Sequence, residues 1–75
     1  MNGTYIDIIK VGKFITVLRQ ERKLSQRQLA EKLNVTRQAI SKWENGLRLP
    51  SPEMLIVLSE FFEVSINEIL KGKRV

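Results

Sequence analysis

Residues 24–46 read LSQRQLAEKLNVTRQAISKWENG, and one short helical pattern gives way to another within this stretch. Ser25 is a good N-cap for the first helix, with Gln28 three residues later in the position of a capping box. The helix ends near Leu33, because the next residue, Asn34, tolerates the left-handed conformation that often ends helices. The stretch therefore predicts a helix, a tight turn and a second helix.

The second helix of the stretch begins after Thr36, ends before Gly46 and has two different faces. At about 100° per residue, Ile40 and Trp43 fall on one side, and four polar residues fall within an arc of about 140° on the other. The polar residues are Arg37, Gln38, Ser41 and Lys42. Arginine can pair with guanine, glutamine with adenine, and lysine with guanine or phosphate, so this face can read bases in the major groove of DNA. An ordinary solvent-facing helix is the alternative, because most exposed helix faces are polar.

Helical patterns continue on both sides of these two helices, and the sequence has no alternating strand pattern. The first helix of the chain carries apolar residues at i, i+3, i+4 and i+7. These residues are Val11, Phe14, Ile15 and Leu18. Its start is open between a capping box formed by Thr4 and Asp7 and a cap at Asp7 alone. Ser51 followed by Pro52 starts a fourth helix and Ser65 starts a short fifth, so we expect a compact all-α fold of five helices.

The composition limits what such a fold can do. The chain has 75 residues, which we divide into an N-terminal extension (1–10), one helical domain (11–71) and a tail that frays (72–75). Without Cys or His, the chain lacks thiolate metal ligands and the usual general base, so we expect no metal, no cofactor and no enzymatic activity. No apolar run approaches about 20 residues and no secretory signal is evident, so we expect a cytoplasmic protein without a membrane span.

The net charge of +5 is concentrated in one part of the chain. Residues 19–48 contain eight Lys or Arg and three Glu, which gives +5, so the remaining residues sum to zero. Residues 51–70 contain four Glu and no Lys or Arg. A basic half and an acidic half indicate a directed electrostatic surface of the kind that DNA-binding domains carry. A solvated surface of mixed charge is the alternative.

Motifs spread over most of the chain carry a resemblance to a known family. They are Leu24-Ser25-Gln26, Leu29-Ala30, Leu33, Val35-Thr36, Ile40-Ser41, Trp43-Glu44-Asn45-Gly46 and Pro50, followed by Leu55, Leu58, Phe62, Val64-Ser65 and Leu70. Over residues 11–71 the chain resembles the phage-repressor/Cro-like (Cro/C1-type) helix-turn-helix family, also called the XRE family. The resemblance implies a lambda-repressor-like domain whose third helix is the recognition helix. The chain departs from the family pattern at Asn34, where glycine is usual, and in a short loop that carries one base, Arg48.

The resemblance also implies roles for individual residues. Base contacts are expected from Arg37, Gln38, Ser41 and Lys42. Phosphate contacts are expected at the starts of the second and third helices and just beyond the third, from Gln26, Arg27, Thr36, Asn45 and Arg48. Arg19 and Glu44 are expected to form a structural ion pair, so Arg19 is not counted as a DNA contact.

The fourth helix has more apolar residues than one face can bury. Some of Ile56, Val57 and Phe61 must therefore face away from the core. One alternative is that they pack under the apolar residues of the N-terminal segment, which are Tyr5, Ile6, Ile8 and Ile9. The other is a dimer contact, as in helix-turn-helix dimers that read half-sites about one turn of DNA apart.

These observations predict a transcriptional regulator that binds double-stranded DNA sequence-specifically, with repression favoured over activation. Its partners would be a palindromic operator and a second copy of the chain in a homodimer, and no small-molecule ligand is indicated. The alternative is a protein-interaction module of the same fold, such as an antitoxin or an adaptor. The surplus apolar surface of the fourth helix would serve that alternative.

Overall fold

Capping residues define where each helix of the structure begins. The computed structural model describes residues 5–75, and its helices are α1 (Ile8–Glu21), α2 (Gln26–Leu33), α3 (Arg37–Glu44), α4 (Pro52–Phe62) and α5 (Ile66–Lys71). Each helix has an N-cap side chain that accepts hydrogen bonds from backbone N–H groups of the first turn, and these are Asp7, Ser25, Thr36, Ser51 and Ser65. No strand occurs in this part of the chain. The all-α fold of five helices is therefore confirmed.

The cap at Asp7 decides where α1 begins. Its Oδ1 accepts hydrogen bonds from the backbone N–H groups of Ile9 and Lys10, at 3.0 and 3.2 Å. Residues 8–10 therefore belong to α1, as the alternative with a cap at Asp7 predicts. Thr4, the other member of the alternative capping box, lies outside the described residues.

Asn34 makes the turn between α2 and α3. Its φ of 59° and ψ of 44° lie in the left-handed region, and its backbone N–H donates to the carbonyl oxygens of Ala30 and Glu31. Asparagine reaches this conformation at a small cost, so the turn tolerates the departure from glycine. Val35 follows, donates its backbone N–H to the Ala30 carbonyl at 3.0 Å and packs against the core.

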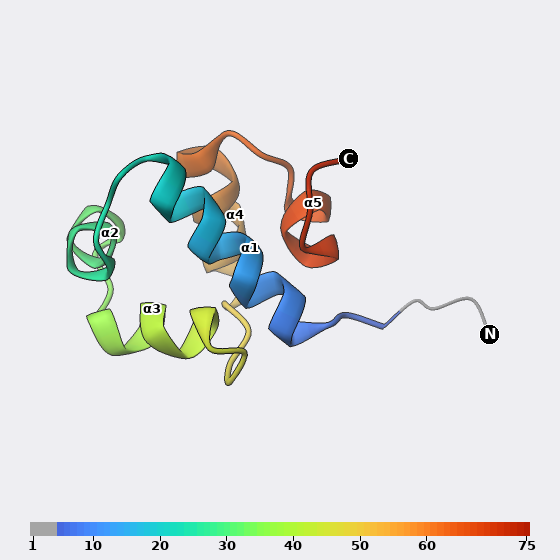
Figure 1. Cartoon of the computed structure of the whole chain (residues 1–75), viewed down its shortest axis with the longest axis horizontal. Helices are drawn as coiled ribbons and strands as arrows, with labels where there is room; N and C mark the ends of the chain where they lie inside the picture. The colour runs from blue at the N-terminus through green and yellow to red at the C-terminus, as the bar shows by residue number, and fades with distance from the viewer. Residues whose placement is uncertain (1–4) are drawn as a thin grey trace.

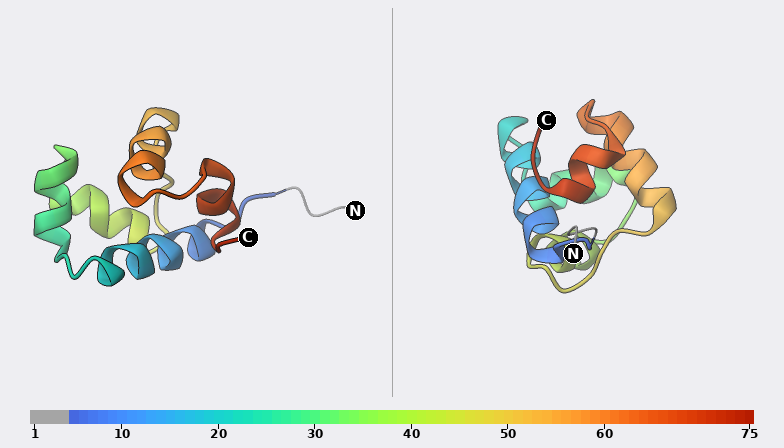
Figure 2. Two further views of the ribbon diagram at one scale, coloured as in Figure 1. Left: turned by 90° about the horizontal axis from the view of Figure 1, so that it is seen from above. Right: turned by 90° about the vertical axis from the view of Figure 1, so that its right-hand side faces the viewer.

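The five helices share one hydrophobic core. In Figure 1, α1 crosses the molecule, and Figure 2 shows the other helices on one side of it. α1 packs against α3 and α5, α2 packs against α3, and α4 packs against α5. Every helix contributes to the most deeply buried side chains, which are Val11, Ile15, Leu18, Leu29, Ile40, Leu58 and Ile69. Within residues 5–75, every helix is too short or too polar to cross a membrane.

Gly12 allows α1 and α3 to approach each other closely. A β-carbon at this position would lie 2.7 Å from the carbonyl oxygen of Glu44, and closer still to that of Trp43. These are backbone atoms, which cannot rotate away as the end of a flexible side chain can. The close approach explains a glycine in the middle of α1, where its low helix propensity is otherwise unfavourable.

The chain end contacts the helices in the structure, and the fraying of residues 72–75 stays a prediction. Gly72 ends α5 in the left-handed conformation, with a φ of 74°. Arg74 then forms an ion pair with Glu21, with 2.7 Å between Nη2 and Oε1, and its hydrogen bonds lower the pKa of Glu21. The backbone N–H of Val75 donates to Oε2 of Glu68 at 3.1 Å. The side chains of Arg74 and Glu21 are 51% and 48% exposed, so this pair contributes little to holding the tail.

Within residues 5–75, part of the outer side of α4 is left exposed. Ile56 and Val57 are 49% and 38% exposed. Tyr5 and Ile6 line an open pocket together with residues of α5 and the chain end, so these two residues do not follow the alternative in which they pack against α4. Phe61 is half-buried and packs against the core. The exposed apolar surface of α4 is therefore made chiefly by Ile56 and Val57.

Candidate nucleic-acid interface

α3 separates a buried face from an exposed polar face. Ile40 is fully buried and Trp43 is 4% exposed, so the indole ring belongs to the core and does not stack on bases. The four residues expected at bases lie exposed or half-buried on the helix, and they are Arg37, Gln38, Ser41 and Lys42. The core therefore fixes the helix and leaves its polar side chains directed to solvent.

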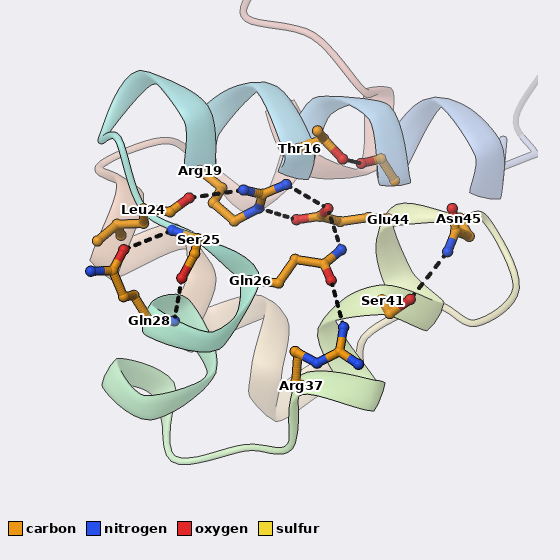
Figure 3. Close-up of polar contacts among 11 residues, drawn as sticks. Thr16, Arg19, Leu24, Ser25, Gln26, Gln28, Arg37, Ser41, Glu44 and Asn45 are labelled. Atoms are coloured by element: carbon orange, nitrogen blue, oxygen red, sulfur yellow. Dashed lines mark hydrogen bonds and ion pairs between the residues drawn. The ribbon is translucent and has the colours of Figure 1, made fainter.

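A partly buried ion pair connects α1 to the end of α3. Nε of Arg19 lies 2.6 Å from Oε2 of Glu44, and Nη2 donates to Oε1 at 3.0 Å, so the contact is bidentate (Figure 3). The two side chains are 13% and 6% exposed. Nη1 of Arg19 also donates to the carbonyl oxygen of Leu24 at 2.8 Å. Arg19 and Glu44 thus form the pair that the resemblance implies, and the arginine faces the protein.

The contacts between Arg19 and Glu44 stabilise the ionised forms of both side chains. Burial raises the pKa of Glu44, but hydrogen bonds from Arg19 and Gln26 and the charge of Arg19 together outweigh burial and hold that pKa below its ordinary value of 4.5. The hydrogen bond to Glu44 in turn raises the pKa of Arg19. The charges of Arg19 and Glu44 offset each other. The positive charge around α2 and α3 therefore comes from other basic side chains, which are Arg27, Lys32, Arg37, Lys42 and Arg48.

Gln26 lies between the ion pair and Arg37. Its Nε2 donates to Oε1 of Glu44 at 2.9 Å, and its Oε1 accepts from Nη1 of Arg37 at 3.3 Å (Figure 3). Gln26 was expected at a phosphate, but both ends of its amide have partners within the protein. Sequence reasoning missed this link because no helical periodicity relates a residue of α2 to one of α3.

The other residues expected at phosphates lie near the ends of α2 and α3. Thr36 uses its hydroxyl oxygen to cap α3, and Nδ2 of Asn45 donates to Oγ of Ser41 at 3.2 Å. Arg27 and Arg48 are exposed. All four side chains are exposed, whereas Gln26 is half-buried.

Arg48 borders a groove between α3 and the start of α4, and half of the residues that line this groove are apolar. The groove is lined by Gln38 and Lys42 of α3, and by Ser51 and Met54 at the start of α4. The structure therefore places Arg48, the basic residue of the α3–α4 loop, beside Gln38 and Lys42, two of the residues expected to contact DNA bases.

The comparison with protein families adds to this geometry. The helix-turn-helix family model matches residues 16–69, which include all of α2, α3 and α4. The chain belongs to the helix-turn-helix family. Membership confirms the resemblance that the sequence motifs carry, and the turn of the helix-turn-helix is the one made by Asn34.

Helix-turn-helix relatives resemble the chain in sequence and in fold. HTH-type transcriptional activator BcrR from Enterococcus faecalis is 52% identical over 56 residues, which are 75% of this chain and 28% of BcrR. The chain therefore spans less than a third of that relative. The structure of the P22 c2 repressor with a synthetic operator is 33% identical, with a TM-score of 0.78 over 84% of this chain and 96% of that one. The structure of SinR with DNA is 33% identical, with a TM-score of 0.72 over 80% and 97%. The lambda-repressor-like fold class is therefore confirmed.

Proposed function

We propose that this protein binds double-stranded DNA sequence-specifically and regulates transcription, with α3 in the major groove. The observation that carries the proposal is the exposed polar face of α3. Ile40 and Trp43 on the opposite face of the helix are buried in the core. A helix fits the major groove of B-DNA, where each base pair presents a distinct pattern of donors and acceptors. The names of BcrR and the P22 c2 repressor, and the DNA bound in the SinR structure, support the same function.

In this proposal, specificity and affinity come from different residues. Base edges are read by Arg37, Gln38, Ser41 and Lys42. Phosphates are contacted by side chains that position the protein without reading sequence, namely Arg27, Thr36, Asn45 and Arg48. Since phosphate contacts supply much of the affinity, binding weakens steeply as the salt concentration rises.

Selection of bound sequences from a random duplex pool tests the proposal directly. A sequence-specific regulator enriches a defined site, and a homodimer enriches a palindromic one. A folded protein that enriches no sequence would contradict the proposal and favour a protein-interaction module, such as an antitoxin or an adaptor.

Arg37→Ala is expected to weaken binding to the selected site by about 1–3 kcal/mol and to relax the preference at one base pair. The physical reason is the loss of a guanidinium that can donate two hydrogen bonds to one base edge. Fluorescence anisotropy titrations with the selected duplex, and with duplexes altered at each base pair, measure both effects.

Arg27→Ala is the matched control for this variant, because Arg27 is an exposed arginine that we place at a phosphate. Its removal should weaken binding to selected and random duplexes alike and reduce the salt dependence. If Arg37→Ala also lost equal affinity for both kinds of duplex, a base contact for Arg37 would be ruled out.

We infer that the regulator is a homodimer and that the exposed side of α4 contributes to the contact. Ile56→Asp places a charge among the apolar residues of that surface, with Ile56 49% exposed in the single chain. It is expected to weaken binding to a palindromic site by at least about tenfold and to leave half-site binding unchanged, because linked half-sites gain from avidity.

Sedimentation of the protein–duplex complexes gives the stoichiometry, with Glu60→Ala on α4 as control. One wild-type chain on a palindromic duplex would refute the homodimer.

We propose repression in the cytoplasm as the biological outcome. P22 c2 is named a repressor and BcrR an activator, so the fold serves both directions of control. Repression follows when the bound site overlaps the promoter. A reporter gene placed downstream of the selected site distinguishes repression from activation, because repression lowers its expression and activation raises it.

A further inference from the structure

We propose that the groove between α3 and the start of α4 binds a short segment of a partner protein that carries apolar and acidic side chains. Such a segment would cover Gln38 and Lys42, two residues expected to contact bases, and would therefore compete with DNA. The competition rests on the proposed function, whereas binding of the segment does not. The observations behind the proposal are the residues that line the groove, their charges and the contacts that hold its two sides.

The lining of the groove combines apolar and basic side chains. The apolar residues are Val35, Ala39, Trp43, Leu49 and Met54. All of them except Trp43 are half-buried, so they retain surface that a partner can cover. Lys42 and Arg48 are exposed, and no Asp or Glu lines the groove. Tryptophan, methionine and arginine are enriched in protein–protein interfaces. A segment with apolar and acidic side chains therefore matches the groove in both polarity and charge.

The two basic side chains of the groove are available to an acidic partner. Among residues 5–75, neither Lys42 nor Arg48 forms an ion pair, although Arg19, Arg27 and Arg74 each form one. Complementary charge speeds the encounter of two proteins and selects one partner over another. The carboxylates of the segment would supply the missing negative charges.

Both sides of the groove are held in place by hydrogen bonds within the protein. The backbone N–H groups of Leu47 and Arg48 donate to the carbonyl oxygen of Lys42 at 2.9 and 3.3 Å, so the loop folds back on the end of α3. Oγ of Ser51 accepts from the backbone N–H of Met54 at 3.2 Å and fixes the start of α4. A surface that is already formed loses less entropy when a partner binds.

The size and polarity of the groove favour a protein segment over a small molecule or DNA. The groove has a volume of about 340 Å³ and is open to solvent. Small-molecule sites have volumes of about 300–1,000 Å³ and enclose most of their ligand, which an open groove at the lower end of this range does not do. DNA presents mainly polar base edges and phosphates, which leave the apolar residues of the groove unused. A protein segment can place apolar side chains there and continue onto the surrounding surface.

Selection from a phage-displayed library of random peptides, with the folded full chain as target, tests the proposal. We expect the enriched peptides to combine apolar with acidic residues. Met54→Gln removes an apolar side chain of the groove and keeps its length and charge. It should weaken binding of a selected synthetic peptide by at least about fivefold, because less apolar surface is buried. Its affinity for the selected duplex should stay within about twofold of wild type, since Met54 is not among the residues expected at DNA. Isothermal titration calorimetry measures the peptide, and fluorescence anisotropy measures the duplex.

Three further variants serve as comparisons. Arg48→Gln removes a charge of the groove and should also weaken peptide binding, which tests the groove independently of α4. Val17→Gln changes an apolar residue of α1 that is 44% exposed and lies outside the groove, so peptide binding should not change. Arg27→Ala should weaken DNA binding and leave peptide binding unchanged, because Arg27 does not line the groove. Circular dichroism checks that each variant is folded.

The possible outcomes separate this inference from the proposed function. The inference is wrong if no peptide is enriched, if the enriched peptides lack acidic residues, or if they bind Met54→Gln and Arg48→Gln as tightly as wild type. A peptide that binds in the groove but is not displaced by the selected duplex would contradict the competition. If the protein enriches no duplex while peptide binding depends on Met54 and Arg48, the proposed function fails and the partner site remains.

Discussion

Glu44→Ala is expected to lower the free energy of unfolding by about 3–5 kcal/mol, because it leaves the partly buried guanidinium of Arg19 without its carboxylate partner. The side chains of Arg19 and Glu44 are 13% and 6% exposed, and they share two hydrogen bonds of 2.6 and 3.0 Å. Domains of this size are only about 5–15 kcal/mol more stable than their unfolded chains, so the variant should be close to unfolding. Urea denaturation followed by circular dichroism measures the difference.

Glu31→Ala is the matched control, since Glu31 is a helical glutamate in an exposed pair with Arg27, 3.6 Å apart. Exposed pairs of this kind contribute little, about 0.3–0.5 kcal/mol. The two substitutions remove the same group from helices of equal length, and they differ in burial and in hydrogen bonding. If both variants lost the same small amount of stability, the ion pair would not be a structural element of this fold.

The same pair makes stability depend on pH. The pKa of Glu44 is lower in the folded protein than its ordinary value of 4.5, so folding favours the charged carboxylate. Its contribution is complete above about pH 4.5 and is lost as the pH falls through the folded pKa. Wild-type protein should therefore lose more stability on acidification than Glu44→Ala does. Equal slopes of stability against pH would show that the carboxylate is not stabilised in the fold.

Gly12→Ala is expected to lower the free energy of unfolding by about 1–3 kcal/mol, although alanine is the better helix former by about 1 kcal/mol. The added β-carbon would lie 2.7 Å from the carbonyl oxygen and 3.0 Å from the carbonyl carbon of Glu44. Relief of this overlap requires α3 to move away from α1. The same movement would displace the proposed recognition face, so DNA affinity should fall along with stability.

Thermal and urea unfolding of Gly12→Ala measure the effect, with Lys13→Ala as the control. Lys13 is the next residue of α1 and is exposed, so its replacement should change stability by less than about 0.5 kcal/mol. A Gly12→Ala variant more stable than wild type would show that helix propensity outweighs the close approach of the two helices.

The features that could be predicted from the sequence depend on neighbours along the chain. N-caps act within one helical turn, so the starts of four helices and the turn at Asn34 were visible in the spacing of a few residues. The two faces of α3 follow from the 3.6-residue period in the same way. The exposed base-reading candidates and the buried Trp43 were therefore assigned to the correct sides.

The features that could not be predicted depend on contacts between helices. The partners of Gln26 come from α3, and the reason for Gly12 is the backbone of Trp43 and Glu44. The pair of Arg74 with Glu21, which lies 53 positions earlier, is a third contact of this kind. Such contacts depend on how the helices are oriented, which local patterns do not encode.

The position of Trp43 gives the protein a built-in optical reporter. It is the only tryptophan of the chain, it is 4% exposed, and its carbonyl oxygen lies at the contact with Gly12. Its fluorescence in the folded state therefore comes from one indole in an apolar environment, and unfolding exposes that indole to water. Because the indole lies on the reverse side of the proposed recognition face, its emission can register a shift of α3 against α1 without an attached dye.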